Sequence, residues 1–279
     1  MEKTAKERYD MDVLERVFNV IHLDMPTPGV FGFFHILWLI LTVEVAVLLC
    51  LLYKRGKIRS ISRVVLTAAL IVIALEIFKQ IRYNVSYDGQ LHFDYQWYIF
   101  PWQFCSVPMY VGVLAGLTRG KFQNVLYSFL ATFAVFAGVC VMIYPGDVFT
   151  GSVWINIQSM ICHASMIVIG VFLFYTGAVK IEHKTILKGM AVFAVAVGVA
   201  VGLNELAYVV GIVPDETFNM FFVSRHCAPS LPVYSTVQGI VPYPWCLFIY
   251  ILGFTVASYI ILLIAMLVKI IATAKKVAS

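Results

Sequence analysis

Cys105 and His163 are the two side chains of this sequence whose types together could carry nucleophilic chemistry. A thiol becomes an effective nucleophile when a nearby base or cation favours its thiolate form. Cys105 follows Pro101 near the expected start of a helix, where the helix dipole favours negative charge. His163 could take the thiol proton, with Glu205 or Asn156 orienting its ring. The two residues therefore predict covalent catalysis if the fold brings them together, and two packing residues in separate helices if it does not.

Charged and polar side chains form a second group of interest, because they stand inside long apolar stretches. Such residues are costly there and indicate either a binding site or polar packing. Glu76, Lys79 and Gln80 have helical spacing, which puts them on one helix face, and Arg82 follows closely. They predict either an internally neutralised pair that holds helices together or one wall of a substrate site. The other candidate substrate contacts come from separate apolar stretches: His35, Gln103, Asn156, Asn204 and Glu205.

The stretches that carry these residues are too apolar for a soluble protein. Apolar residues make up 61% of the chain and charged residues 13%, whereas soluble domains contain roughly half and a quarter. A soluble fold would have to cover its surface with this small polar minority, but a bilayer solvates apolar surface directly. The composition therefore predicts an all-α polytopic membrane protein, with residues 1–279 forming a single transmembrane domain.

The expected transmembrane helices follow from length. A helix needs about 20 mostly apolar residues to cross a hydrocarbon core of roughly 30 Å. The stretches that meet this requirement are 30–53, 62–82, 98–118, 122–144, 153–176, 185–211 and 244–270. They predict a bundle of about seven transmembrane helices. The third stretch is the least regular, because it contains Pro101 and Pro108.

Basic residues occur in every second connection between these stretches. They are Lys54, Arg55, Lys57, Arg59, Arg63, Arg119, Lys121, Lys180, Lys184, Lys188, Lys269, Lys275 and Lys276. Short loops rich in Lys and Arg stay in the cytoplasm. We therefore expect a multi-pass protein of the plasma membrane, with its N-terminus outside and its C-terminus in the cytoplasm.

Three segments outside the spans have recognisable patterns. Residues 1–28 contain apolar residues at helical spacing before Pro26, which predicts an amphipathic helix in an extracellular or interfacial segment. Asp88-Gly89, between Val85-Ser86-Tyr87 and Gln90-Leu91-His92, predicts a hairpin turn. The connection 212–243 is rich in proline and in apolar residues, and we expect it to fold back as an outer loop or lid.

Cofactor and partner expectations are mostly negative. The six cysteines form no CxxC pair and no zinc-finger spacing, so we expect no metal and no cofactor. The net charge of +5 is what basic cytoplasmic loops produce, and nucleic acid need not be a partner. The pattern of residues says nothing about the oligomeric state.

The segment 100–110, in which Cys105-Ser106 stands near the start of a span, resembles the bacterial YwaF-type integral membrane family. Further similarity runs from Tyr144-Pro145 through Asn156 to Cys162-His163, and includes Asn204-Glu205. The resemblance covers most of the chain, from about Pro26 to the end of the last predicted span. The family includes the eukaryotic transmembrane protein 164, regarded as a phospholipid acyltransferase that uses a cysteine and a histidine. The resemblance implies Cys105 as nucleophile, His163 as base, and membrane phospholipids or acyl lipids as partners.

The leading hypothesis is therefore a membrane-embedded lipid acyltransferase or thioesterase-like enzyme, with Cys105 and His163 in an outward-facing polar pocket. The alternative is a transporter or small-molecule-binding membrane protein in which intramembrane Glu and Lys residues, including Glu44, line a polar pathway. A scaffold or sensor without turnover is a third hypothesis.

Overall fold

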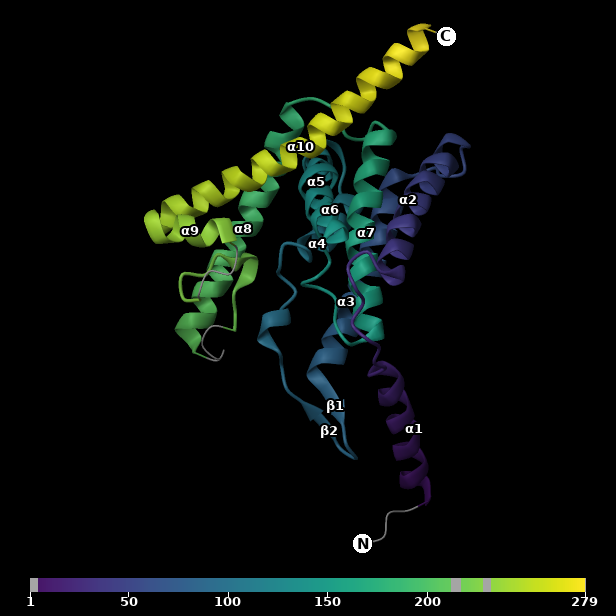
Figure 1. The fold of residues 1–279 in the computed structure, drawn as a ribbon, viewed down its shortest axis with the longest axis vertical. Helices are drawn as coiled ribbons and strands as arrows, with labels where there is room; N and C mark the ends of the chain where they lie inside the picture. Colours follow the sequence, from purple (N-terminus) through teal and green to yellow (C-terminus); the bar gives the residue numbers. More distant parts are fainter. Residues whose placement is uncertain (1–4, 212–216, 228–231, 279) are drawn as a thin grey trace.

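The computed structural model describes residues 5–211, 217–227 and 232–278, and these are mostly helical (Figure 1). Six helical segments among the described residues are long and apolar enough to cross a membrane. They are α2 (Phe33–Lys54), α3 (Ile61–Asn84), the continuous run α5 (Gly120–Phe129), η2 (Leu130–Ala134) and α6 (Val135–Ile143), α7 (Val153–Tyr175), α8 (Lys184–Val210) and α10 (Tyr243–Ala278). The predicted all-helical membrane architecture is confirmed, whereas the number of crossings and their orientation stay predictions.

The stretch 98–118, predicted as one span, is not a single helix. It contains η1 (Trp97–Ile99), an irregular segment over 100–106, and the helix α4 (Val107–Leu117) of 11 residues. Such a helix is about 16 Å long, roughly half of a hydrocarbon core of about 30 Å. Pro108 explains the late start, because proline is tolerated only in the first turn of a helix.

The chain nevertheless runs back along the bundle through this broken segment. The Gln123 side chain, near the start of α5, donates a hydrogen bond to Ser62 Oγ, near the start of α3, at 2.9 Å. The starts of α3 and α5 therefore lie at the same end, and residues 85–119 must return the chain from the far end of α3. Irregular backbone at membrane depth is tolerated where it is buried in protein.

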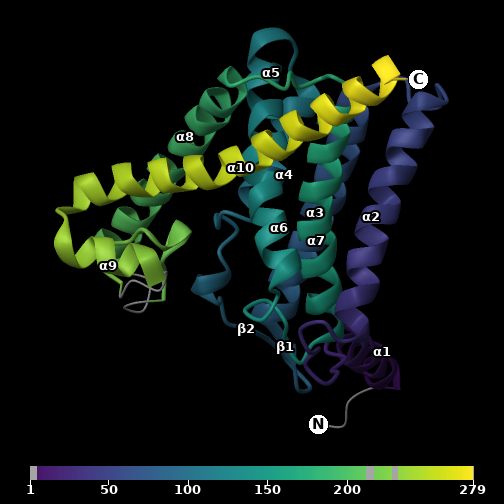
Figure 2. The ribbon, with the colours of Figure 1, turned by 45° about the horizontal axis from the view of Figure 1, so that its top comes forward.

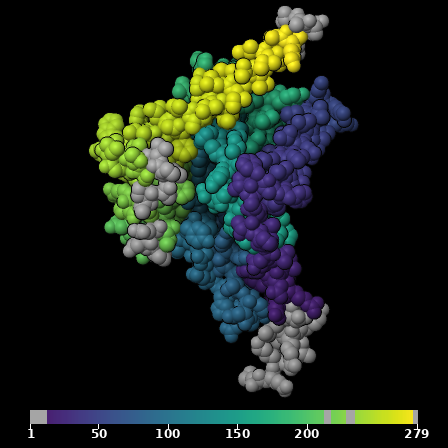
Figure 3. Space-filling model, viewed as in Figure 1, coloured from purple at the N-terminus to yellow at the C-terminus, as the bar shows by residue number. Residues whose placement is uncertain are grey.

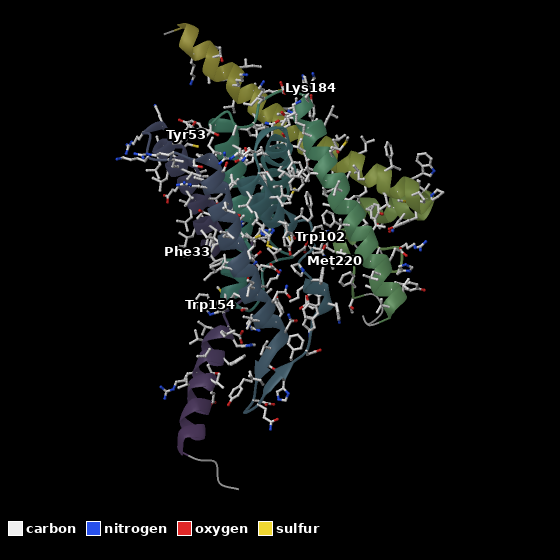
Figure 4. All side chains as sticks on the ribbon, turned by 180° about the vertical axis from the view of Figure 1, so that it is seen from behind. Phe33, Tyr53, Trp102, Trp154, Lys184 and Met220 are labelled. Atoms are coloured by element: carbon white, nitrogen blue, oxygen red, sulfur yellow. The ribbon has the colours of Figure 1, made fainter. Side chains whose placement is uncertain are left out.

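One end of the bundle gathers the basic loops, and we call it the basic end. Asn124 of α5 donates to the Ala178 carbonyl and accepts from Lys188 Nζ, which joins the α7–α8 connection to the start of α5. Figure 4 shows Tyr53 and Lys184 at this end, with Phe33 and Trp154 towards the other. The convergence of these loops fits the charge pattern from which the orientation was predicted.

The opposite end carries the predicted hairpin, and we call it the hairpin end. Strands β1 (Val85–Tyr87) and β2 (Leu91–Phe93) pair antiparallel, with Ser86 opposite His92. The second strand begins one residue later than the pattern predicts, because the turn has three residues. Its middle residue, Gly89, has φ of 102°, a conformation that L side chains rarely adopt.

The predicted N-terminal helix is present as α1 (Ala5–Ile21) and projects from the hairpin end (Figures 1 and 3). Its apolar residues Val13, Leu14 and Val17 remain exposed, as expected of a helix that lies in a membrane interface. Trp154 of α7 donates its indole N–H to the Val20 carbonyl at 2.7 Å, which fixes the end of α1 to the bundle.

Helix α7 is the centre of the packing, because α2, α3 and the η2–α6 run all pack against it. Close approach depends on small residues, as is usual between helices in membranes. A Cβ added at Gly138 of α6 would lie 2.7 Å from the His163 carbonyl oxygen. On α4, Cβ atoms at Gly112 and Gly116 would lie 2.8 Å and 2.6 Å from the Cβ atoms of α3 side chains.

Helices α8 and α10 form the other side of the molecule, and α10 crosses the bundle obliquely (Figures 1 and 2). Between them lie η3 (Met220–Phe222) and α9 (Pro232–Ile240), which belong to the predicted outer loop or lid. The remaining parts of that loop, 212–216 and 228–231, lie outside the described residues.

Candidate functional site

Cys105 lies directly before α4, next to the N-cap residue Ser106. The backbone N–H groups of Ser106 and Val107 both donate to the Gln103 carbonyl, which closes a turn around Cys105. The sequence predicts a helix that begins near Pro101 and contains Cys105 in its first turn, but α4 begins at Val107, so Cys105 lies just before the helix N-terminus. Free N–H groups and the positive end of the helix dipole favour negative charge at this point.

The Cys105 side chain faces a small cavity between α3, α4 and α7, which we call the Cys105 cavity. Its volume is about 30 Å³, room for about one water molecule. Cys162 and Ser165 of α7 line it too, and the Cys162 thiol points to the Cys105 carbonyl at 3.7 Å. The two α7 residues were not predicted site residues, although their spacing of three places them on one helix face.

His163 is buried, and its ring is oriented by its own helix. Nδ1 lies 2.7 Å from the Ser159 carbonyl oxygen, which can only accept a hydrogen bond. Nδ1 therefore carries the proton, and Nε2 is left with a free lone pair. Among the described residues Nε2 has no hydrogen-bond partner. The carbonyl of Ser159, rather than Glu205 or Asn156, thus takes the orienting role that the sequence assigned to a third residue.

His163 lies near Cys105 because its neighbour on α7, Cys162, contacts the Cys105 backbone. His163 follows Cys162 on the same turn. Helix α3 packs against both α4 and α7, and residues of all three line the Cys105 cavity, so these elements meet in one region. Within the described part of the chain, no hydrogen bond joins the Cys105 thiol to the His163 ring. The catalytic pairing of the two residues stays a prediction.

The polar residues of α3 share one face, as predicted, and bind one another. Lys79 forms an ion pair with the buried Glu76 at 2.8 Å. The Gln80 amide donates to Glu76 Oε1 and to the Ile99 carbonyl, each at 2.9 Å, and Asn84 donates to Gln80 at 3.2 Å. The internally neutralised pair, one of the two structures predicted for this face, is present, and the predicted role as a wall of a substrate site stays a prediction.

The same face also lines a pocket of about 370 Å³ between α3, the hairpin and α4, which we call the Glu76 pocket and whose accessible surface is mostly apolar. Glu76 and Gln80 contribute to it from one side, and Tyr95 and Tyr110 from the other. Burial, together with the nearby Glu76 carboxylate, raises the pKa of the Tyr95 phenol, so Tyr95 stays neutral and able to donate. Met109 lines both this pocket and the Cys105 cavity, so the two spaces adjoin.

Arg82, also predicted as a substrate contact, points towards the hairpin end. Its guanidinium lies 3.8 Å from the Asp24 carboxylate, which is mostly exposed. Asp24 in turn forms a backbone bridge with Ser152, so this region joins α3 to two loops.

His35 and Asn156 are occupied by backbone groups. The Phe31 N–H donates to His35 Nδ1 at 2.9 Å, so Nε2 carries the proton and donates to the Met142 carbonyl at 2.8 Å. The Asn156 amide binds both the N–H and the carbonyl of Thr150, each at 2.8 Å. Both side chains hold loops in place, and we do not include them in the substrate site proposed below.

Gln103 and Asn204 clamp one loop from two directions. Gln103 donates to the Asn219 carbonyl at 3.1 Å and accepts from the Phe221 N–H at 3.0 Å. Asn204 donates to the Met220 carbonyl at 3.1 Å and accepts from its N–H at 2.8 Å. These two predicted substrate contacts therefore position the backbone of residues 219–221.

The clamped loop is buried and strained. Phe221 and Phe222 both have φ of 57°, a region that bulky residues seldom adopt and that the surroundings must stabilise. Tyr250 of α10 donates to the Phe221 carbonyl at 2.9 Å, and Met220 is completely buried. The Phe104 ring, next to Gln103 in sequence, stacks on the Phe221 ring with centroids 5.8 Å apart.

Glu205 ties the next part of the loop to α8. It pairs with Arg225 at 2.8 Å and with His226 at 3.1 Å. The His226 ring stacks on Tyr208, with centroids 3.6 Å apart. Glu205 therefore binds residues of the predicted lid.

Metal binding has no obvious site in the part of the chain that the structure describes: no three His, Cys, Asp or Glu side chains there are grouped to hold an ion.

Comparison with known proteins gives one match. The model of the transmembrane protein 164 family, TMEM164, matches residues 30–269. No curated protein and no solved structure matches the chain.

Proposed function

Because the chain belongs to the TMEM164 family, we propose that it is a membrane-embedded enzyme that transfers an acyl chain from a membrane lipid through a thioester on Cys105. The observation that carries this proposal is the setting of Cys105. Its thiol stands at the N-terminus of α4, faces a cavity, and adjoins the turn of α7 that presents His163 with an unbonded Nε2. A nucleophile and an oriented base are the two components that covalent catalysis requires.

In the first step, His163 Nε2 takes the proton of the Cys105 thiol, and the thiolate attacks the carbonyl carbon of a lipid ester. An S–C bond forms and the ester C–O bond breaks. The lysolipid leaves as an alcohol, because the His163 imidazolium returns its proton to the departing oxygen. The acyl chain stays on Cys105 as a thioester.

In the second step, a lysolipid hydroxyl or a water molecule gives its proton to Nε2 and attacks the thioester carbonyl. The C–S bond breaks, and the Cys105 thiolate recovers its proton. Attack by a lysolipid makes the protein an acyltransferase, and attack by water makes it a hydrolase of the thioesterase type. The Glu76 pocket, with Glu76 and Gln80 at its wall and Lys79 paired with Glu76, would hold the part of the lipid next to the ester close to the thiol.

Transport through an intramembrane relay is less well supported. A relay needs titratable groups that can exchange protons or ions in sequence. Glu76 is paired with Lys79, Glu205 is paired with Arg225, and Glu44 lies exposed on α2. These three carboxylates do not form a continuous pathway, so we favour acyl transfer.

The proposed site of action is the plasma membrane, with the hairpin end outside. This placement comes from the gathering of basic loops at the opposite end, since such loops stay in the cytoplasm. Accessibility of an introduced cysteine at exposed Asp88 to a membrane-impermeant reagent on intact cells tests it directly.

The chemistry is tested by trapping the intermediate. Purified protein is incubated with a phospholipid that carries an alkyne-labelled acyl chain, and the protein-bound label is measured before and after hydroxylamine treatment. We expect a hydroxylamine-sensitive adduct on the wild type and none on Cys105→Ala.

Cys140→Ala is the matched control, because Cys140 is a free, exposed cysteine on α6 and should leave the adduct unchanged. An absent adduct on the wild type, or an undiminished adduct on Cys105→Ala, would show that the proposal is wrong.

A further inference from the structure

A groove of about 570 Å³ lies between α2, α3 and α7, and we call it the apolar groove. It remains open because α2 and α3 each pack against α7 rather than against each other. Its accessible surface is almost entirely apolar. Thr42 and Ser165 line it, but each hydroxyl donates to a backbone carbonyl of its own helix at 2.7 Å. The walls of the groove therefore suit a hydrocarbon chain.

The apolar groove has about the depth of one leaflet of a bilayer. Its lining runs from Arg63 to Val72 on α3 and from Trp38 to Leu52 on α2. At a rise of about 1.5 Å per residue, these stretches are roughly 14 Å and 21 Å long. A hydrocarbon core is about 30 Å thick, so the groove reaches from the basic end to the middle of the bilayer. This is the depth that the acyl chains of one lipid occupy.

Five basic residues stand where the groove reaches the basic end, and we call them the basic-loop cations: Lys54, Arg55, Lys57, Arg59 and Arg63. Figure 4 shows Tyr53, the residue before them, at this end of α2. All five cations are exposed, and residues 54–63 contain no Asp or Glu. Within the described part of the chain none of the five forms an ion pair. The end of the groove therefore carries uncompensated positive charge.

The connection that carries these cations is held by the caps of two helices. Helix α2 ends in a Schellman motif, in which Gly56 has φ of 68° and the Lys57 N–H donates to the Leu52 carbonyl at 3.0 Å. At the other side, the N-cap Ser60 accepts a hydrogen bond from an N–H of α3. Ile58, between the two caps, lines the groove. The cations on either side of Ile58 are therefore held at the mouth of the groove, and Arg63 itself lines it.

The preference of basic loops for one side of a membrane explains cations at this end in general. It does not explain a groove beneath them. The α7–α8 connection is also basic, but there Lys188 lies 3.8 Å from the Glu182 carboxylate, and α8 does not line the groove. The combination of an apolar groove and uncompensated cations at its mouth is therefore specific to the α2–α3 connection among these two.

We propose that the apolar groove binds an anionic phospholipid from the leaflet at the basic end, with an acyl chain along α2, α3 and α7 and the phosphate beside Arg59 and Arg63. A zwitterionic lipid could place its chain in the same groove. Only a headgroup with net negative charge gains from the cations, about fivefold in affinity per cation, the factor that corresponds to about 1 kcal/mol. The inference goes beyond the proposed function and is independent of it, because no part of it uses Cys105.

Photo-crosslinking with two lipid probes tests the assignment. One probe is phosphatidylglycerol and the other phosphatidylcholine, each with a diazirine in the same acyl chain. Either is added as a small fraction to the protein in phosphatidylcholine nanodiscs, and labelled peptides are identified by mass spectrometry. We expect the phosphatidylglycerol probe to label groove peptides of α2 and α7 at least fivefold more than the other probe does. Both probes should label the exposed faces of α8 and α10 equally, and Cys105→Ala should give the same pattern as the wild type.

A charge variant tests the headgroup contact. Arg59→Gln with Arg63→Gln removes two cations at exposed positions and keeps the groove, so the preference for phosphatidylglycerol should fall at least fivefold. Lys180→Gln with Lys184→Gln is the matched control, because it removes two exposed cations at the same end but away from the groove. The control should keep the preference of the wild type.

A filling variant tests the chain contact. Thr67→Leu with Ala164→Leu occupies the groove from α3 and α7, and labelling of groove peptides by the phosphatidylglycerol probe should fall at least fivefold. Ala191→Leu, at an exposed position on α8, is its control and should change nothing. If the unfolding temperature of the filled variant falls strongly, Thr67→Leu alone replaces it, with a partial loss of labelling expected.

Equal labelling of the groove by the two probes would overturn the proposal, and so would a preference that survives the loss of Arg59 and Arg63. A groove without lipid label, together with crosslinks between the α2 helices of two molecules, would assign it to a second copy of the chain and overturn the proposal as well. An absent acyl adduct with selective labelling of the groove would keep this lipid site and contradict only the chemistry proposed for Cys105.

Discussion

The Gln103 side chain accepts a hydrogen bond from the Phe221 backbone N–H at 3.0 Å, across 118 residues of sequence. Gln103 stands two residues before Cys105, and Phe221 stands in a buried loop with a left-handed backbone. This single amide therefore connects the position of the candidate nucleophile to the loop between α8 and α10. A displacement of that loop would be transmitted to the turn that holds Cys105.

Replacement of Gln103 by leucine should loosen the loop. The variant leaves the Phe221 N–H without its hydrogen bond to Gln103, and an unsatisfied buried group costs about 1–3 kcal/mol; the Asn219 carbonyl keeps the Phe222 N–H as a donor. We expect a lower unfolding temperature and faster hydrogen exchange over residues 219–224, measured by mass spectrometry. Gln96→Leu is the control, because among the described residues the Gln96 side chain binds Asp94 alone, at the exposed surface. Equal exchange in the two variants would contradict the clamp.

The close approach of α3 and α4 predicts that Gly116→Ala destabilises the protein. A Cβ there would lie 2.6 Å from the Leu66 Cβ and 3.1 Å from its Cα, so Gly116→Ala forces the two helices apart. Overpacking of this kind costs about 1–3 kcal/mol, and α4 carries Cys105 at its start. We expect a lower unfolding temperature and less acyl adduct.

Gly198→Ala on α8 is the matched control for that substitution. A Cβ at Gly198 meets nothing within 4 Å, so the change should be neutral or stabilise by up to about 1 kcal/mol. Thermal unfolding in detergent, followed by tryptophan fluorescence, compares the two. A destabilisation of the same size in both would mean that helix packing is not the cause.

The orientation of His163 predicts that substitutions of His163 and of Ser159, one turn earlier on α7, have different effects on the rate of adduct formation. His163→Gln removes the proposed base and should slow adduct formation by about 10²–10⁴-fold, the usual contribution of a general base. Ser159→Ala keeps the backbone carbonyl that binds Nδ1 at 2.7 Å and removes only a hydroxyl at 3.4 Å. Its rate should stay within a few-fold of wild type. If Ser159→Ala were as slow as His163→Gln, the hydroxyl would be the orienting group.

The burial of His22 at the hairpin end predicts that the unfolding temperature of the protein depends on pH. Burial, and secondarily the Arg82 charge, lowers the pKa of His22 below its ordinary value of 6.5. Because the folded state binds the proton more weakly than the unfolded state, the contribution of neutral His22 is complete above pH 6.5 and is lost as the pH falls below it. We expect the unfolding temperature of the wild type to fall more than that of His22→Gln between pH 8 and pH 5. Parallel curves would exclude His22 as the source.

Local periodicity in the sequence determined much of the architecture. Long apolar stretches predicted the membrane-spanning helices, because a bilayer requires a continuous apolar run. Asp88-Gly89 predicted the hairpin, and the spacing of Glu76, Lys79 and Gln80 predicted their common face. Pro101 and Pro108 marked the irregular third stretch, although its division into a turn, an irregular segment and a short helix was not foreseen.

Only the tertiary structure decided which of these elements meet. Gln103 and Asn204 were predicted to contact a substrate, and they instead bind the backbone of one loop. Helices α2 and α3 both pack against α7 rather than against each other. The reason is physical. A helix that faces lipid can be apolar all round, so its sequence does not mark the side that packs. Lipid chains are as apolar as leucine, so packing depends on small residues and hydrogen bonds, and the sequence alone does not show their partners.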